Sequence, residues 1–317
     1  MSATVHATNA APSIVVLGAA GRLGHILTDT LPRLGFPTLG ITRTGTPQCA
    51  AAVDVTDPRW SKPASWRSVT AGWPPITAVI NLVTGREPEA RQAEASSRAG
   101  VEVMRAVTEA IGGEPLMVHL GSIGEASRPP LSAYVAGKIA ARRAANADGR
   151  VTVLTVAIVP RAVGAKADRT LRMLCRLSPC IAAQPIPVTA GEIFAHTLAS
   201  LLSDGTAAGR HMVLAACEQP LGQVLGTRNR AGTLGDHTAR ALIAAPTAGK
   251  MLGGRAVSLA KAALGSTVIE HYAAAIPSSS YLAASTPGQL VARHNDDELG
   301  SWWLVPADIA DRRATLV

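Results

Sequence analysis

The chain contains 317 residues, of which 47% are apolar but only 3% aromatic, so a substantial core must consist mainly of Ala, Val, Leu and Ile. Its formal charge is +8, from 30 basic and 22 acidic residues, yet the basic residues are scattered and form no stripe. This dispersion argues against a nucleic-acid partner, whereas a small anionic ligand is compatible with the charge.

The first segment, residues 1–12, is short, polar and Ala-rich, and we expect it to be a disordered tail. It lacks the basic region and following apolar run that a secretory signal peptide requires. No stretch of the sequence approaches the roughly 18 consecutive apolar residues of a membrane span. The sequence therefore predicts a cytoplasmic protein with no membrane partner.

From residue 13 onward, short β-branched runs alternate with helix-like segments, and no hairpin signal separates them. This alternation predicts βαβ units and hence an α/β fold with a Rossmann-type, doubly wound parallel sheet. The expected strands are 13–17, 38–42, 51–55, 78–83, 116–120 and 151–159, and the expected helices are 23–34, 86–111 and 134–147. We assign residues 13–165 to this core.

The remaining residues, 166–317, are less regular because prolines interrupt their first part. A helix is expected over 192–202 and a strand over 211–215, while residues 226–317 are expected to be mostly helical or irregular. We assign 166–317 to a smaller, mostly helical C-terminal substrate-binding region that is interleaved with the last core elements.

A glycine-rich turn, GAAGRLG, follows the first expected strand and opens the first expected helix, with Gly18, Gly21 and Gly24 spaced three residues apart. A tight turn needs backbone freedom, and a diphosphate must approach the backbone closely. The unpaired amides at the start of the helix can then bind the phosphates. The turn therefore predicts a dinucleotide-binding core.

The end of the second strand indicates which dinucleotide binds. An NAD site usually carries an acidic residue about 20 residues after the glycine turn. Here Arg43 follows the strand between Thr42 and Thr44, and with help from Arg22 it can pair with a 2′-phosphate. The alternative is a solvated arginine beside a site that accepts either cofactor, and the pattern favours NADP(H) over NAD(H). Asp54 is a candidate for the adenine edge and equally for a turn residue.

Of the three tyrosines, only Tyr134 is followed four residues later by a lysine, Lys138. On a helix this spacing places both side chains on one face. A free phenol has a pKa near ~10, which a nearby ammonium and an oxidised nicotinamide both lower. Tyr134 can then give a proton to a carbonyl oxygen as hydride arrives, while Lys138 can also hold the ribose hydroxyls.

Ser122 follows the fifth strand, twelve residues before Tyr134, and its hydroxyl can polarise the reacting carbonyl. Ser132 is the rival but fits a helix N-cap better. Without catalysis, Tyr134 would be a surface aromatic and Ser122 a loop cap. His119 is expected to be a core histidine with satisfied hydrogen bonds. The four cysteines have no metal-ligand spacing, so no metal site is predicted.

Together these residues resemble the extended branch of the short-chain dehydrogenase/reductase superfamily, the NAD-dependent epimerase/dehydratase-like enzymes, and notably its deoxysugar nucleotide ketoreductases. The resemblance covers roughly residues 12–226 and includes segments 81–83, 159–164, 186–192, 208–211 and 220–222. It implies a small carbonyl or alcohol substrate and a homodimer formed through two helices. The expected cofactor contacts are Gly18, Gly21, Arg22, Leu23, Gly24, Arg43, Asp54, Val55, Leu82, Val83, Lys138 and Val159.

The sequence departs from the family pattern at positions that bear on the reaction. Val159 and Val163 stand where the family usually has Arg and Tyr, which argues against a sugar-nucleotide pocket of the common kind. Ile123 and Gly124 replace the Asp-Glu pair of the dehydratases, which argues against dehydration. We expect a ketone reductase. The alternatives are an epimerase that keeps its cofactor bound, and a non-catalytic NADP(H)-sensing regulator, against which the Tyr-Lys pair argues.

Overall fold

The structure is a computed structural model of the chain. It describes residues 13–45, 49–85, 87–122, 125, 133–156, 185–187, 189, 191–204, 208–216, 218–220, 222, 292–296 and 300–306. The predicted tail at 1–12, Ser132, and Val159 with its neighbouring segment 160–164 lie outside these residues.

A sheet of nine strands runs through the described residues in the order β10-β11-β8-β6-β5-β4-β1-β2-β3. All neighbouring strands from β3 to β8 are parallel. The chain builds outward from β1 to β3, crosses back to β4, and builds outward again, which confirms the predicted doubly wound parallel core. The parallel strands are β1 Ser13–Leu17, β2 Thr38–Thr42, β3 Cys49–Ala52, β4 Ile76–Asn81, β5 Leu116–Ser122, β6 Val151–Val156 and β8 His211–Ala216.

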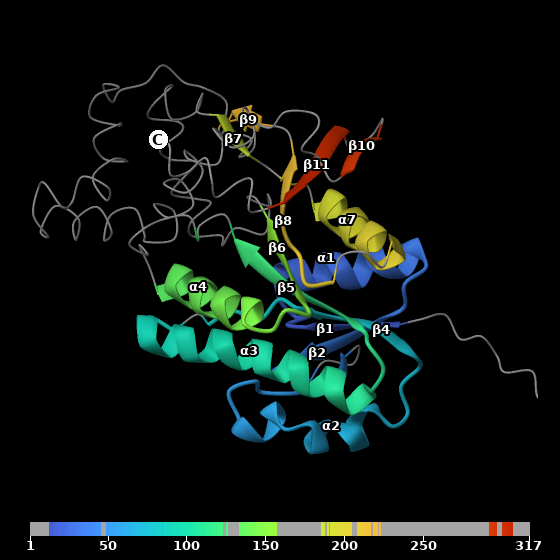
Figure 1. Cartoon of the computed structure of the whole chain (residues 1–317), viewed down its shortest axis with the longest axis vertical. Coiled ribbons are helices and arrows are strands. Elements are labelled where there is room, and N and C mark those ends of the chain that lie inside the picture. The colour runs from blue at the N-terminus through green and yellow to red at the C-terminus, as the bar shows by residue number, and fades with distance from the viewer. Residues whose placement is uncertain are drawn as a thin grey trace, which may run out of the picture.

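Helices cover both faces of this sheet (Figure 1). On one face α3 (Ala90–Ile111) and α4 (Ala133–Asn146) lie side by side, with α2 (Pro63–Thr70) packed against α3. On the other face α1 (Arg22–Thr30) contacts α7 (Gly191–Asp204). Short 3₁₀ turns, Leu31–Leu34 and Pro58–Ser61, follow α1 and precede α2.

The strand β1 shows why the central strands lack alternation of apolar and polar residues. Ile14 and Val16 point into the core beneath α1 and α7, whereas Val15 and Leu17 point into the core beneath α2 and α3. All four are fully buried because helices cover both faces of the parallel sheet. The continuous apolar run SIVVL is the sequence signature of this environment.

A close contact between α3 and α4 sets the height of α4 above the sheet. A Cβ added at Gly137 would lie 2.6 Å from the Ser97 hydroxyl and 2.8 Å from the Ala93 carbonyl oxygen, both on α3. Only a glycine leaves room for this approach. Because Lys138 follows directly, the same contact fixes how deeply its side chain enters the protein.

Two strands lie in the C-terminal part, which was expected to be mostly helical or irregular. Residues 292–296 and 300–306 form the antiparallel pair β10 (Ala292–Asp296) and β11 (Gly300–Pro306), and no strand was predicted there. The β11 strand pairs antiparallel with β8 and so extends the sheet. Its apolar run SWWLVP is a strand signal, whereas polar β10, ARHND, lies at the sheet edge and shows no strand pattern of its own.

Two further elements were not predicted. The helix α2 begins with Pro63 at its first turn, after the 3₁₀ turn that Asp57 caps by accepting a hydrogen bond from the Arg59 amide at 3.0 Å. Its fully buried Trp66 donates a 2.8 Å hydrogen bond to the Trp60 carbonyl. A small separate sheet pairs β7 (Pro185–Pro187) with β9 (Glu218–Pro220). These are short segments that long-range contacts stabilise, which explains why local periodicity did not indicate them.

Candidate active site

The glycine turn lies at the switch point between β1 and β4, where the two halves of the sheet diverge. Gly18 has a φ of 84°, which favours glycine, and its carbonyl accepts a 2.9 Å hydrogen bond from the Gly21 amide. A Cβ at Gly24 would lie 2.5 Å from the Gly18 oxygen and would also clash with the Ala19 oxygen. The turn and α1 therefore pack together as closely as their backbones permit.

This turn has the properties of a phosphate site. The helix α1 begins at Arg22, its N-cap Gly21 provides no side-chain cap, and its first turn contains no acidic residue. The helix dipole favours negative charge at this end, and the leading amides of a helix are common anion ligands. A Cβ at Gly18 would lie 3.4 Å from the Val83 nitrogen, so the predicted cofactor contacts Leu82 and Val83 lie beside the turn.

The end of β2 carries no acidic residue next to the turn, as predicted. The hydroxyl of Thr42 donates a 2.7 Å hydrogen bond to the Thr44 carbonyl and closes the backbone around the exposed Arg43. Asp54 accepts hydrogen bonds from the Thr56 amide at 3.0 Å and the Thr56 hydroxyl at 2.7 Å. These bonds, with a smaller contribution from Arg43, hold the pKa of Asp54 below its ordinary value. These bonds fit the turn role of Asp54, and its contact with the adenine edge stays a prediction.

The structure places Tyr134 and Lys138 on α4 and docks this helix on the end of β5. Tyr134 lies in the first turn and is half-buried, whereas Lys138 is only 3% exposed. The Lys138 ammonium donates a 2.8 Å hydrogen bond to the Leu120 carbonyl, two residues before Ser122. Four helical residues span about 6 Å, so the Cα atom of Tyr134 lies about one turn before that of Lys138, toward the start of α4. Ser122 closes β5 and is 8% exposed.

Burial of Lys138 changes its acid–base behaviour. Desolvation lowers the pKa of its ammonium from 10.5 to about 8, although the negative charge of Glu125 opposes this effect. Lys138 in turn helps to hold the pKa of His119 well below its ordinary value, where burial is the larger cause. His119 is therefore neutral at physiological pH, and Lys138 changes charge in a range that an enzyme can use.

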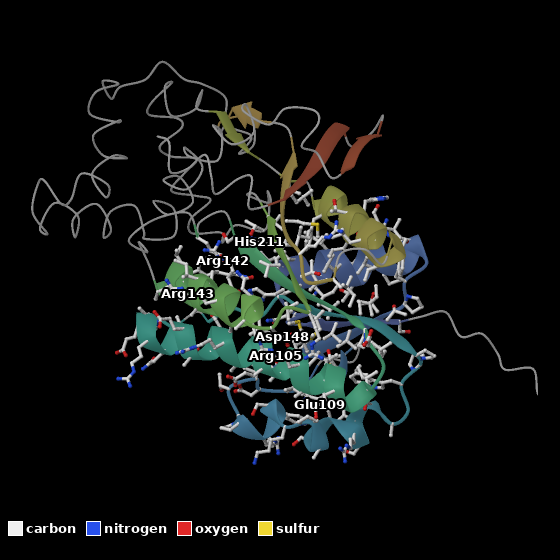
Figure 2. The ribbon with its side chains drawn as sticks, viewed as in Figure 1. Arg105, Glu109, Arg142, Arg143, Asp148 and His211 are labelled. Carbon is white, nitrogen blue, oxygen red and sulfur yellow. The ribbon has the colours of Figure 1, made fainter. Side chains whose placement is uncertain are left out.

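Glu125 is a residue of this site that sequence reasoning missed. Its side chain is buried, and its Oε1 atom accepts a 2.6 Å hydrogen bond from the Ser122 amide. Its Oε2 atom lies 3.0 Å from Nε of Arg142 on α4 (Figure 2 shows Arg142). Burial raises the pKa of Glu125 to about 7, against the opposing effects of Arg142, Lys138 and the Ser122 amide. Tyr134, Lys138 and Arg142 are four residues apart and so lie on one face of α4, but nothing in the sequence near Glu125 indicates that it contacts this face.

A buried polar pair lies deeper in the sheet. The Asn81 amide nitrogen donates to Nδ1 of His119 at 3.1 Å, and its Oδ1 atom accepts a 3.0 Å hydrogen bond from the Val83 amide. His119 is fully buried, and its Nε2 atom has no hydrogen-bond partner among the described residues. The expected core histidine is thus satisfied at one ring nitrogen only. Asn81 links it to the backbone that leaves β4 beside the glycine turn.

Other predicted features can be placed only in part. Of segment 186–192, residues 186 and 187 belong to β7, and residues 191 and 192 begin α7. Gly209, with a φ of 70°, turns the chain into β8. The part of the chain that the structure describes contains no group of three His, Cys, Asp or Glu residues suited to a metal. In the same residues, no helix is both long and apolar enough to cross a membrane.

No protein-family model matches the chain, and no curated protein matches its sequence. Solved structures do match. A reductase engineered for asymmetric catalysis has a TM-score of 0.54 at 13% identity, covering 73% of this chain and 90% of its own. A nucleoside-diphosphate-sugar epimerase from Staphylococcus aureus has a TM-score of 0.53 at 13% identity, covering 83% and 89%. The Bordetella bronchiseptica enzyme WbmG, in complex with NAD and UDP, has a TM-score of 0.52 at 17% identity, covering 70% and 80%.

These similarities concern the fold, because the identities are low. They agree with the parallel sheet and flanking helices described above. The described part of the chain therefore has the Rossmann-type fold that these epimerases and reductases share.

Proposed function

We propose that the chain is an NADP(H)-dependent oxidoreductase of the extended short-chain dehydrogenase/reductase type, which reduces a ketone on a small biosynthetic intermediate. One observation carries the proposal: Lys138 of α4 binds the carbonyl of Leu120, so that the Tyr-Lys face of α4 lies over the end of β5 that Ser122 closes. The glycine turn lies at the same carboxyl edge of the sheet, beside the end of β4.

The residues present fit a nicotinamide dinucleotide. The tight turn at Gly18, and the start of α1, where Gly21 supplies no side-chain cap, suit the diphosphate. When bound, the reduced cofactor supplies the hydride. The Tyr134 phenol then gives its proton to the carbonyl oxygen, and the Ser122 hydroxyl donates a hydrogen bond that polarises this carbonyl. The Lys138 ammonium stabilises the phenolate that remains and so lowers the pKa of Tyr134.

The cofactor preference follows from the end of β2. Arg43 is exposed there, and the end of β2 itself carries no acidic residue to bind ribose hydroxyls. A guanidinium forms strong, charge-assisted hydrogen bonds with a phosphate. We therefore favour NADP(H), with NAD(H) as the weaker ligand.

The substrate class follows from the resemblance and from the fold. A nucleotide-linked keto-deoxysugar is our first candidate. The structures of similar fold include an epimerase and an enzyme bound to NAD and UDP, which supports sugar-nucleotide epimerisation as the second candidate function. Cytoplasmic location and dimerisation through two helices remain predictions.

We expect purified protein to oxidise NADPH in the presence of at least one nucleotide-linked keto-sugar, with one alcohol formed for each cofactor consumed. The assay follows nicotinamide absorbance across a panel of such sugars and simple ketones, with product identified by mass spectrometry. Interconversion of two sugar nucleotides without net loss of NADPH would instead identify an epimerase. Binding of NADPH without turnover of any substrate would favour the non-catalytic sensor.

A further inference from the structure

The buried carboxylate of Glu125 lies where it can act on the proposed proton transfer. Its Oε1 atom holds the Ser122 amide at 2.6 Å. Its Oε2 atom is within 3.0 Å of Nε of Arg142, yet makes no hydrogen bond of acceptable geometry with any described residue. One oxygen is thus fixed to the strand end, and the other is held by charge alone.

Room for this carboxylate comes from a glycine. A Cβ at Gly121 would lie 3.1 Å from the Glu125 Oε1 atom and 2.8 Å from the Thr155 hydroxyl on β6. The absence of a side chain at this position allows the carboxylate to lie directly against the end of β5. Gly121 therefore contributes to the placement of Glu125. The carbonyl of the preceding residue, Leu120, accepts the hydrogen bond from Lys138.

The ionisable groups here form a small, defined set. Within the described residues, Lys138 is acted on by Glu125 and itself acts on His119 of β5, while Arg142 of the same helix acts on Glu125. Burial disfavours the charged forms of both Glu125 and Lys138, and each charge partly offsets the cost of the other. A buried ion pair is weak evidence for stability, because apolar residues of similar size are often as stable or more so. Stability alone therefore does not explain why Glu125 and Lys138 are buried together.

We propose that Glu125 is a positioning residue for the proposed reduction: its carboxylate fixes the backbone at Ser122 and keeps Lys138 in the ammonium form beside Tyr134. This inference rests on the function proposed above. Without the negative charge, the buried amine would lose its proton more readily and could no longer stabilise a phenolate. Without the hydrogen bond, the Ser122 backbone would lose a partner that orients its hydroxyl.

The experiment compares wild-type protein with Glu125→Gln in pH profiles of kcat/KM, using NADPH and the substrate that the panel identifies. Activity requires the ammonium form, so it falls as pH rises through the pKa of Lys138. In Glu125→Gln this alkaline limb should move to lower pH by about one unit or more, which corresponds to about a fivefold loss near pH 8 and about a tenfold loss at pH 9 and above. At about pH 6 the loss should be smaller, because the amine is protonated in both proteins.

Two further variants isolate the effect. Glu109→Gln, at an exposed position of α3 labelled in Figure 2, is the matched control and should keep the wild-type profile. Arg142→Gln removes the cation that favours the ionised carboxylate. It should therefore shift the limb in the same direction as Glu125→Gln, and it provides the test if Glu125→Gln does not fold.

The outcomes separate this inference from the proposed function. Superimposable profiles for wild-type protein and the folded Glu125→Gln variant would overturn the role of Glu125 and leave the reductase assignment intact. If Glu125→Gln does not fold, a profile of Arg142→Gln that superimposes on wild type would likewise overturn the role of Glu125. Wild-type protein that neither binds NADPH nor consumes it would overturn the proposed function, and the role of Glu125 with it.

Discussion

The Tyr134→Phe variant is expected to lose at least about a hundredfold of kcat for NADPH-dependent reduction, because it lacks the proton that the carbonyl oxygen must receive. Removing a general acid of this kind typically costs two to four orders of magnitude, or roughly 3 to 5 kcal/mol of transition-state stabilisation. The Tyr134 side chain is half-buried in the first turn of α4, and phenylalanine keeps its ring, so the fold should survive the change. NADPH affinity should stay within about threefold of wild type.

Steady-state kinetics and a cofactor titration on the same samples measure both quantities. Arg143→Gln, at an exposed position of the same helix labelled in Figure 2, serves as the matched control and should retain normal turnover. Turnover of Tyr134→Phe at a rate close to wild type would exclude Tyr134 as the acid. If Tyr134→Phe loses both turnover and its fold, the test passes to Tyr134→His. This variant has a proton donor at the same position and should show part of the wild-type activity.

The Lys138→Met variant should combine a loss of activity with a gain in stability. The phenolate of Tyr134 loses the cation proposed to stabilise it, and the ribose loses a donor, so kcat/KM should fall by about a hundredfold or more. Unlike Tyr134→Phe, this variant should also bind NADPH less tightly. The pattern of lower turnover with weaker cofactor binding distinguishes the two roles on α4.

The stability gain follows from the burial of Lys138. Folding lowers the pKa of Lys138 from 10.5 to about 8, because the folded protein disfavours the charged amine. Above about pH 10.5 the amine is neutral in both states and its burial carries no charge penalty. This stability is lost progressively as pH falls, and the loss is complete once pH has fallen through about 8. This difference corresponds to roughly 3 kcal/mol against folding at pH 7, part of which the lost hydrogen bond to Leu120 offsets. Lys138→Met should therefore unfold at a higher denaturant concentration than wild type at pH 7. A less stable variant would show that Lys138 is mainly structural.

Local sequence patterns predicted those parts of the molecule that depend on neighbouring residues. The glycine turn was recognisable because Gly18, Gly21 and Gly24 meet the needs of one strand, one turn and one helix start. The pair Tyr134 and Lys138 was recognisable because helix geometry alone places them on one face. Parallel strands such as β1 were recognisable because burial on both faces leaves a continuous apolar run.

Features that depend on distant contacts were not predictable in this way. Glu125 is surrounded by residues that resemble an ordinary loop, and its burial depends on Arg142 of α4 and on the space above Gly121. His119 resembled a satisfied core residue, but its single described partner, Asn81, comes from the neighbouring strand β4. The β10 strand has no apolar pattern and forms only because β11 pairs with it. Each depends on tertiary contacts that no short window of sequence contains.

Calorimetric titration of the purified chain with NADPH tests the central claim most directly, because every proposed role requires a dinucleotide at the glycine turn. We expect one cofactor per chain, a dissociation constant in about the micromolar range, and weaker binding of NADH. Arg43→Ala should weaken NADPH binding about tenfold or more, as the loss of a charge-assisted contact implies, and leave NADH binding unchanged. Absence of binding heat with both cofactors, across temperatures that would reveal a heat-capacity change, would contradict the account.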